Sequence, residues 1–406
     1  MTLAASQQAK FNLTRGFAKQ FPAFHGSASG FSVGKEHDSS AALRNRSASR
    51  RSLQPPGAWA CLMNFLEFQV DKLQQAGASL LSPASIFSAP QLAVAFTLAF
   101  AYLAWRQFRR RKAVRLSALL RATMSRRILF HRSTAADLFY FFVNTFAIGG
   151  LIGWGLFSSL AISEGCVHVL RAAFGARTPS SAPEWALRVG ITLTVFLGYE
   201  FGYYVDHYLK HKIPFLWAFH KTHHTAEVLT PLTVFRVHPV DTLIFVDILA
   251  IAIGVSQGLV TYVAGKNVSL YLIENTNIIT VAFLFLLAQL QHSEFWIPLT
   301  GVAGRILLSP AHHQIHHSSD PAHYDSNLGS FLAIWDWLFG TLSIPPKQSP
   351  HLKFGVTQAN SDPHRISALL IEPGAEALAA LGLAANGSRG ETRVPSPVTI
   401  DTQPQS

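Results

Sequence analysis

The sequence predicts an all-α fold: a polytopic helical bundle in a membrane, with about four or five transmembrane helices and a histidine-rich cap on the cytoplasmic side. Three observations support this expectation, namely an apolar composition, apolar segments of nearly spanning length, and clusters of histidine between them. Hydrophobic residues make up 49% of the 406 residues and charged residues only 14%. These proportions are typical of an integral membrane protein.

Five apolar segments are long enough, or nearly long enough, to cross a bilayer. They are residues 90–105, 137–162, 186–205, 242–264 and 268–291. The third segment carries Arg188 near one end and Glu200 near the other, which leaves its boundaries the least defined. The first segment is short, so both four and five crossings stay open.

The basic residues are unevenly distributed along the chain. There are 33 Lys and Arg against 22 Asp and Glu, a formal net charge of +11. Ten basic residues lie between Arg106 and Arg132, whereas residues 163–185 contain only Arg171 and Arg177. The positive-inside rule therefore places the basic cluster in the cytoplasm, and counting crossings brings every histidine cluster to the same face. No RNA-binding or DNA-binding motif interleaves aromatic residues with these arginines, so we expect anionic lipid headgroups as the contact and no nucleic acid.

Composition also divides the chain. Residues 1–57 are rich in Ser, Ala and Arg, which indicates a disordered or targeting tail. We expect an N-terminal membrane and basic linker region at 58–135, the histidine-bearing domain at 136–345, and a C-terminal extension at 346–406 that is disordered from about residue 384. An odd number of crossings would leave the basic tail outside, unless it is removed or residues 58–70 dip into the membrane. The membrane is then a bacterial inner membrane or the endoplasmic reticulum, or an organellar membrane if the tail is a transit peptide.

Histidine is the residue type that points to chemistry. Twelve of the 18 histidines fall between His207 and His323, less than a third of the chain. They are His207, His211, His220, His223, His224, His238, His292, His312, His313, His316, His317 and His323. Many stand three or four positions apart, and on a helix residues at that spacing share a face. If residues 312–317 are helical, His313, His316 and His317 can converge on one point, while His312 faces elsewhere.

Clustered imidazoles predict a metal site. Neutral imidazole binds Zn, Cu, Fe and Ni, so the ligand type does not select the metal. One zinc ion is usually held by three or four protein ligands, whereas at least eight histidines are available here in matched groups. That supply favours two metal ions. The two cysteines, Cys61 and Cys166, are too few for a disulfide scaffold or a thiolate site.

Three motifs, HYLKH, HKTHH and HHQIHH, resemble the H-x3-H, H-x2-H-H and H-x2-H-H boxes of the fatty acid hydroxylase superfamily, also called the sterol desaturase family. The later stretch SNLGSFLAIWDWLFGTL is similar to the segment that follows the last box in many members. The resemblance covers roughly residues 137–345 and leaves both termini outside it. It implies a helical membrane bundle with a cytoplasmic di-metal cap, in which two non-haem iron ions activate O2 to oxidise a lipid C–H bond.

The resemblance also implies the ligands, carried over box by box. The expected metal ligands are His207, His211, His220, His223, His224, His292, His313, His316 and His317. His238, His312, His323 and Asp206 are further candidates, either as ligands or as partners of the ligand rings. Acids near the boxes, including Glu200, Asp320 and Asp325, are also candidates to orient the rings through their second nitrogen.

The resulting expectation is an O2-dependent oxidoreductase, a di-iron lipid hydroxylase or desaturase acting on a sterol, a fatty acyl chain or a related membrane lipid. No fused electron-transfer domain is visible, so an external donor is implied: a cytochrome b5-like protein, a ferredoxin or a reductase. Two other classes stay open, a histidine-rich metal-ion transporter and a non-catalytic relative that binds lipid. Transport would place polar ligands in mid-segment, whereas the boxes lie at segment ends and in loops. The oligomeric state does not follow from the sequence.

Overall fold

The computed structural model describes residues 70–71, 74, 77–78, 81–85, 88–111, 125–144, 156–356 and 362–383. Within these ranges the regular structure is helical, apart from one two-stranded hairpin. The expected tail at 1–57, the expected disordered end from residue 384, and Cys61 all lie outside the described ranges.

The first half contains α3 (Ala89–Arg109), α5 (Arg126–Leu129), α6 (Arg132–Phe142), α8 (Ser159–Phe174), α9 (Glu184–Lys212), α10 (Pro214–His224), the 3-10 turn η3 (Pro231–Phe235) and α11 (Pro239–Ala264). The second half contains β1 (Leu272–Ile273), β2 (Thr276–Asn277), α12 (Ile278–Phe283), the π-helical turn η4 (Leu284–Ala288), α13 (Gln289–Gln291), α14 (Gly301–Ile306), α15 (Pro310–His316), the 3-10 turn η5 (Pro321–His323), α16 (Ile334–Phe339), α17 (Ile366–Leu370) and α18 (Glu372–Ala380).

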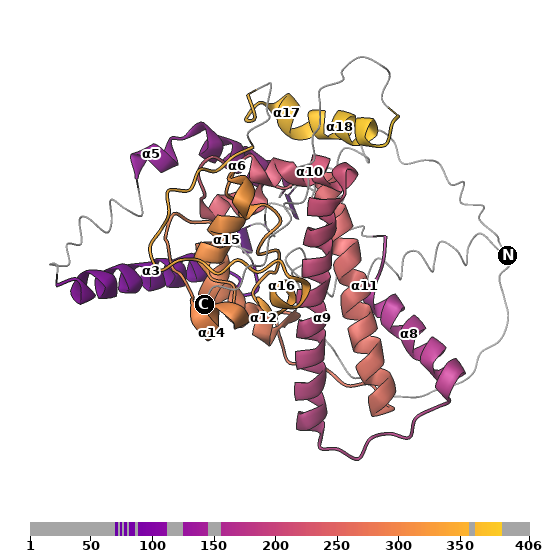
Figure 1. Cartoon of the computed structure of the whole chain (residues 1–406). Coiled ribbons are helices and arrows are strands. Elements are labelled where there is room, and N and C mark those ends of the chain that lie inside the picture. The colour runs from indigo at the N-terminus through magenta and orange to yellow at the C-terminus, as the bar shows by residue number, and fades with distance from the viewer. Residues whose placement is uncertain are drawn as a thin grey trace, which may run out of the picture.

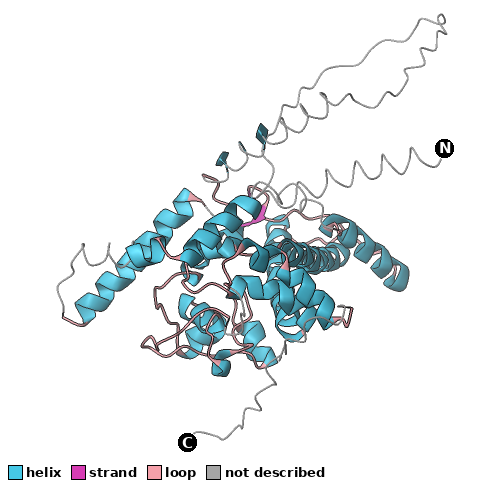
Figure 2. Ribbon diagram, turned by 90° about the horizontal axis from the view of Figure 1, so that it is seen from above, coloured by secondary structure: helices cyan, strands magenta, loops and turns pink. Residues whose placement is uncertain are grey.

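Three helices, α8, α9 and α11, lie side by side and extend away from the rest of the molecule (Figure 1). Of the helices in the described ranges, α11 is the one that is long and apolar enough to cross a membrane. The shorter helices gather beside the C-terminal half of α9. There α10 lies against the C-terminal α18, and α3 lies on the opposite side (Figures 1 and 2). The long helices therefore lead to a compact cap.

Three of the expected apolar segments form continuous helix: residues 90–105 lie within α3, 186–205 within α9 and 242–264 within α11. Segment 268–291 was expected to be one helix, and this expectation is wrong, because its first part is the β1–β2 hairpin. Glu274 and Asn275 form the tip of that hairpin, with φ of 48° and 64°.

Segment 137–162 also contains more than one element. α6 ends at Phe142 and α8 begins at Ser159, while residues 145–155 lie outside the described ranges. Four or five crossings, with the histidines on the cytoplasmic side, therefore remain predictions.

Two backbone anchors hold the segment between η5 and α16 against the bundle. The buried Glu200 carboxylate of α9 accepts hydrogen bonds from the backbone N–H groups of Phe331 (3.0 Å) and Leu332 (2.8 Å). Asp336 accepts from the N–H groups of Leu328 (2.7 Å) and Gly329 (2.9 Å). Both carboxylates thus satisfy backbone donors that would otherwise be buried without partners. Glu200, expected to contact a histidine ring, has this scaffolding role instead.

Glycine permits the close packing of α11 on α8. A Cβ atom added at Gly258 would lie 2.7 Å from Cys166 Cβ and 2.8 Å from the Ser163 carbonyl oxygen. One added at Gly254 would lie 2.6 Å from the Ser159 carbonyl oxygen. The two glycines are four residues apart and so lie on the same face of α11, a pattern that lets helices approach closely in membranes.

We expect Gly258→Ala to lower stability by about 1–3 kcal/mol, because its methyl group would force α8 away from α11. Thermal unfolding in detergent, followed by circular dichroism, would measure the change. Gly190→Ala in α9 is the matched control, since a Cβ there meets nothing within 4 Å. Equal unfolding temperatures for the two variants would contradict the close packing.

Candidate metal centre

Three helices and one helix end carry the histidine boxes. His207 and His211 lie on the last turns of α9, and His220, His223 and His224 end α10. His313 and His316 lie on α15, and His317 caps it. His292 follows α13 directly, at the end of a stretch that contains the π-helical turn η4. Such turns often occur at functional sites, where the extra residue redirects a side chain.

The structure brings all nine expected ligands together in two groups. We call His207, His211, His220, His224 and His316 the five-histidine group, and His223, His292, His313 and His317 the four-histidine group. Within each group one ring nitrogen from every residue lies within 4.8 Å of the others. The expected number of two metal positions therefore matches the number of groups, although the role of these residues as ligands stays a prediction.

The second and third boxes are divided between the groups, so the expectation that His313, His316 and His317 converge on one point is wrong. Residues 310–316 are helical as expected, yet His316 belongs to the five-histidine group while His313 and His317 belong to the other. In the same way, His223 separates from its neighbour His224. Adjacent side chains on a helix point about 100° apart, so each short helix can serve two centres that lie beside it.

Hydrogen bonds fix the rings of the five-histidine group through Nδ1. The Nδ1 atom lies 2.8 Å from the Leu328 carbonyl oxygen in His207 and 3.0 Å from the Ser326 carbonyl oxygen in His316. Acceptors of this kind place the proton on Nδ1 and leave the Nε2 lone pair free. The buried Nε2 atoms of all five residues have no hydrogen-bond partner in the described part of the chain.

Carboxylates hold two more rings of this group. His211 Nδ1 lies 3.3 Å from Asp325 and His220 Nδ1 lies 3.1 Å from Asp241. Asp325 was among the acids expected near the boxes, whereas Asp241 was missed. Asp241 lies one turn into α11, 17 positions after His224, and only the fold brings it to His220. Of the other expected acids, Asp320 caps η5 by accepting from Ala322 N–H.

In the four-histidine group the Nε2 atoms of neighbouring rings lie close to one another. His292 Nε2 lies 3.2 Å from His223 Nε2 and 2.9 Å from His313 Nε2, and His317 Nε2 lies 3.1 Å from His313 Nε2. Four lone pairs aimed at one another are unfavourable unless a proton or a cation lies between them. A metal ion would satisfy all four at once, so this donor set fits a metal.

Burial keeps these rings uncharged. Desolvation lowers the pKa of His207, His220, His224, His292, His313, His316 and His317 well below the ordinary histidine value, and mutual repulsion among the rings adds to it. Desolvation also lowers the pKa of His223 to about 4. The neutral imidazole is the form that binds metal, so both groups are ready for metal at neutral pH.

The four further candidates lie outside both groups. His312 is fully buried, but its Nδ1 pairs with Ser309 in a capping box and its Nε2 lies 3.2 Å from the Gly304 carbonyl oxygen. His238 caps α11, and His323 ends η5. Asp206 forms an ion pair of 2.7 Å with the buried Lys210, which also pairs with Asp241. Lys210 and Asp206 thus act on His220 through Asp241 and do not touch the groups.

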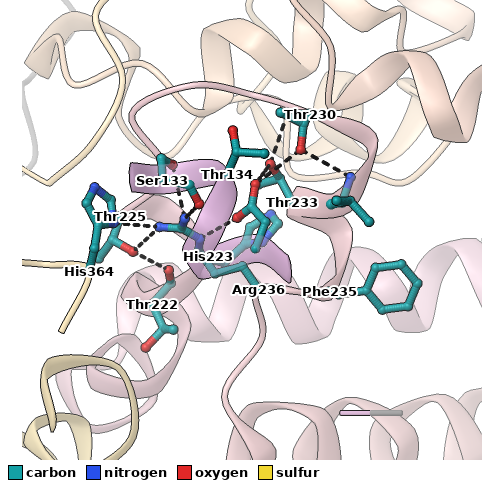
Figure 3. Close-up of polar contacts among 12 residues, drawn as sticks. Ser133, Thr134, Thr222, His223, Thr225, Thr230, Thr233, Phe235, Arg236 and His364 are labelled. Carbon is teal, nitrogen blue, oxygen red and sulfur yellow. Dashed lines mark hydrogen bonds and ion pairs between the residues drawn. The ribbon is translucent and has the colours of Figure 1, made fainter. Parts of the chain in front are cut away.

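A second buried charge network lies beside His223 (Figure 3). Arg236 and Asp137 are both fully buried and form an ion pair of 2.6 Å. Thr230 and Thr233 donate to the second carboxylate oxygen of Asp137, and Arg236 donates to Thr225, the residue that caps α10. The network fastens the end of α10, which carries His223 and His224, to α6. Only its burial in the structure distinguishes Arg236 from the many other arginines.

The comparisons with known proteins agree with the motifs. Residues 192–341 match the family model described as fatty acid hydroxylase. Alkylglycerol monooxygenase of Homo sapiens is 29% identical over 164 residues, and that of Danio rerio is 28% identical over 162 residues. Ornithine lipid hydroxylase OlsE of Rhizobium tropici is 31% identical over 166 residues. No solved structure matches the chain.

The similarity is partial on both sides. The matched residues are 40–41% of this chain, and they cover 32% of the two alkylglycerol monooxygenases and 45% of OlsE. All nine residues of the two histidine groups lie inside the segment matched by the family model, whereas α3, α5, α6, α8, α17 and α18 lie outside it.

We expect His316→Ala and His317→Ala to lose different metal ions, because the first removes a ring from the five-histidine group and the second from the four-histidine group. Each variant should retain about half of the metal bound by the wild type, measured by mass spectrometry after anaerobic loading with Fe2+. His312→Gln is the control and should retain all of it. If His312→Gln lost metal while His316→Ala and His317→Ala kept all of theirs, the third histidine box would be assigned one residue out of register.

The free energy of unfolding of the metal-free protein should fall as the pH drops below about 6.5. The histidines bind protons in the unfolded chain at that pH, whereas the buried rings of the folded chain stay neutral. For His223 and His312, whose pKa values burial lowers to about 4, the loss is about 1.4 kcal/mol per pH unit and per group, from pH 6.5 down to 4. Urea unfolding at about pH 7.5 and 5.5 measures it. His223→Asn should have a shallower pH dependence. A flat wild-type profile over that range would show that the rings are not desolvated.

Proposed function

Because the chain belongs to the fatty acid hydroxylase superfamily, we propose that it is an oxidoreductase that uses O2 to hydroxylate or desaturate a membrane lipid at two iron ions held by the five-histidine and four-histidine groups. The single observation that carries this proposal is the set of nine convergent ring nitrogens, five of which are buried and have no hydrogen-bond partner among the described residues. Buried polar atoms are normally satisfied, so this arrangement supports two resident cations.

The protein residues supply position and exclusion of water. Leu328, Ser326, Asp325 and Asp241 orient the rings, and the surrounding helices bury them. Iron, when bound, supplies the oxidising power that an unactivated C–H bond requires. A dry, rigid centre also protects the reaction from water. The all-nitrogen set fits iron but does not distinguish it from zinc or copper, so the choice of iron rests on the family.

The substrate class is a lipid, and its finer identity is not assigned. The names of the relatives point to two chemistries, an alkylglycerol and an ornithine lipid, and both lipids carry long hydrocarbon chains next to a polar headgroup. We propose that electrons come from a separate donor, which is a cytochrome b5-like protein, a ferredoxin or a reductase. A metal transporter fits less well, because none of the nine rings lies on α11, the candidate membrane span among the described residues.

Purified protein should contain about two iron atoms per chain and should consume O2 only when both a lipid extract and an external reductant are present. Lipid mass spectrometry of cells with and without the gene, grown with and without O2, would identify the product. The His316→Ala variant is the matched control for these cells. One zinc ion per chain in cells supplied with ample iron, together with no O2 uptake on any extract, would overturn the proposal.

A further inference from the structure

A mostly apolar cavity of about 160 Å³ lies beside the four-histidine group, and Thr230, which also donates to Asp137, is one of the residues that line it. Four separate parts of the chain form its walls: α3, α5, the start of η3, and the stretch around α13. Leu229, Leu290 and Phe295 are among the residues that line it. Most of this surface is hydrocarbon.

The inner wall adjoins a candidate metal ligand. Gln289 and Leu290 come just before His292, and Ser293, Glu294 and Phe295 come just after it, so the cavity lining flanks His292 on both sides in the chain. Gln314 of α15 fixes this wall by donating to the carbonyl oxygens of Ser293 (2.7 Å) and Phe295 (3.0 Å). Gln314 also follows His313 in sequence. The cavity and the four-histidine group therefore share one rigid support.

The cavity is closed at one end and exposed at the other. Ala95 and Leu290 are buried and belong to one core cluster, and Leu229 is 1% exposed, so these residues form the inner part. Phe96 and Leu129 are 46% and 48% exposed, and Glu294 is also exposed, so these residues form the rim. Arg127 of α5 lies near enough to Glu294 for its positive charge to favour the ionised carboxylate. Charge at the rim and hydrocarbon inside suit a molecule with a polar head and an apolar tail.

We propose that this cavity binds a segment of the hydrocarbon chain of the lipid substrate beside His292, and that Ala95 and Leu129 select which chains enter. The inference rests on the proposed function and deepens it. Two of the four walls, α3 and α5, lie before the segment that matches the family model. Selection among lipids is thereby assigned to a part of this chain that lies outside its histidine-bearing domain.

Ala95→Phe tests the proposal, because the added ring fills the inner part of the cavity. Ala93→Phe is the matched control, since it makes the same change on an exposed face of the same helix two residues away. Leu129→Trp narrows the cavity from the rim and serves as a second variant, because extra bulk at the buried Ala95 costs about 1–3 kcal/mol and can impair folding. Iron content reports whether each variant retains its metal centre.

The probe is a glycerolipid with a photoreactive diazirine near the middle of its alkyl chain, irradiated with the detergent-solubilised full chain. Attachment sites are mapped by mass spectrometry, so the measurement does not depend on turnover. We expect wild-type labelling on the cavity residues, about tenfold less in Ala95→Phe and Leu129→Trp (about 1.4 kcal/mol of lost binding), and no change in Ala93→Phe. Iron content should be the same in all four proteins.

Labelling confined to the outer face of α11, or unaffected by either narrowing variant, would overturn the cavity assignment while the proposed function stands on its iron and O2 uptake. Labelling of the cavity in a protein that holds no iron and consumes no O2 would have the opposite meaning: a lipid site without the proposed chemistry. The two failures are therefore distinguishable.

Discussion

The rest of the structure depends on keeping nine imidazole rings buried from water, uncharged and convergent in two groups. Burial removes the water that would solvate them and lowers their affinity for protons. Every ring nitrogen must then find another partner, because a buried polar atom without one lowers the stability of the fold. In the five-histidine group, backbone carbonyls and carboxylates meet one nitrogen of four rings and leave the opposite nitrogen free for a cation. The fold can be understood as the scaffold that supplies those acceptors.

That scaffold is assembled from distant parts of the chain. Glu200 and Asp336 hold the loop whose carbonyl oxygens reach His207 and His316. Asp137 and Arg236 join α6 to the end of α10. Such buried ion pairs are expensive to desolvate and are more convincing as devices that specify one geometry than as sources of net stability. The polar groups around the metal centre thus set positions, and apolar packing supplies the stability.

The sequence predicted some of this well. The i, i+3 and i+4 spacing of His313, His316 and His317 is a local property, and α15 is helical as expected. The division of each box between two groups is not local, because it depends on how α9, α10 and α15 cross. Asp241 and Arg236 were missed for the same reason: nothing near them in sequence marks a partner that only folding brings close. The prediction of one helix over residues 268–291 was wrong because a hairpin and a helix can have the same apolar composition.

The division of neighbouring histidines has a mechanical consequence. His223 and His224 are joined by one peptide bond yet face different centres, and so are His316 and His317. Any rotation of α10 or α15 about its axis must therefore disturb both centres together. A movement of the rings in one group is therefore passed to the other group through the helix that carries neighbouring histidines of both. The five-histidine and four-histidine groups therefore move together, and the two short helices α10 and α15 set the distance between them.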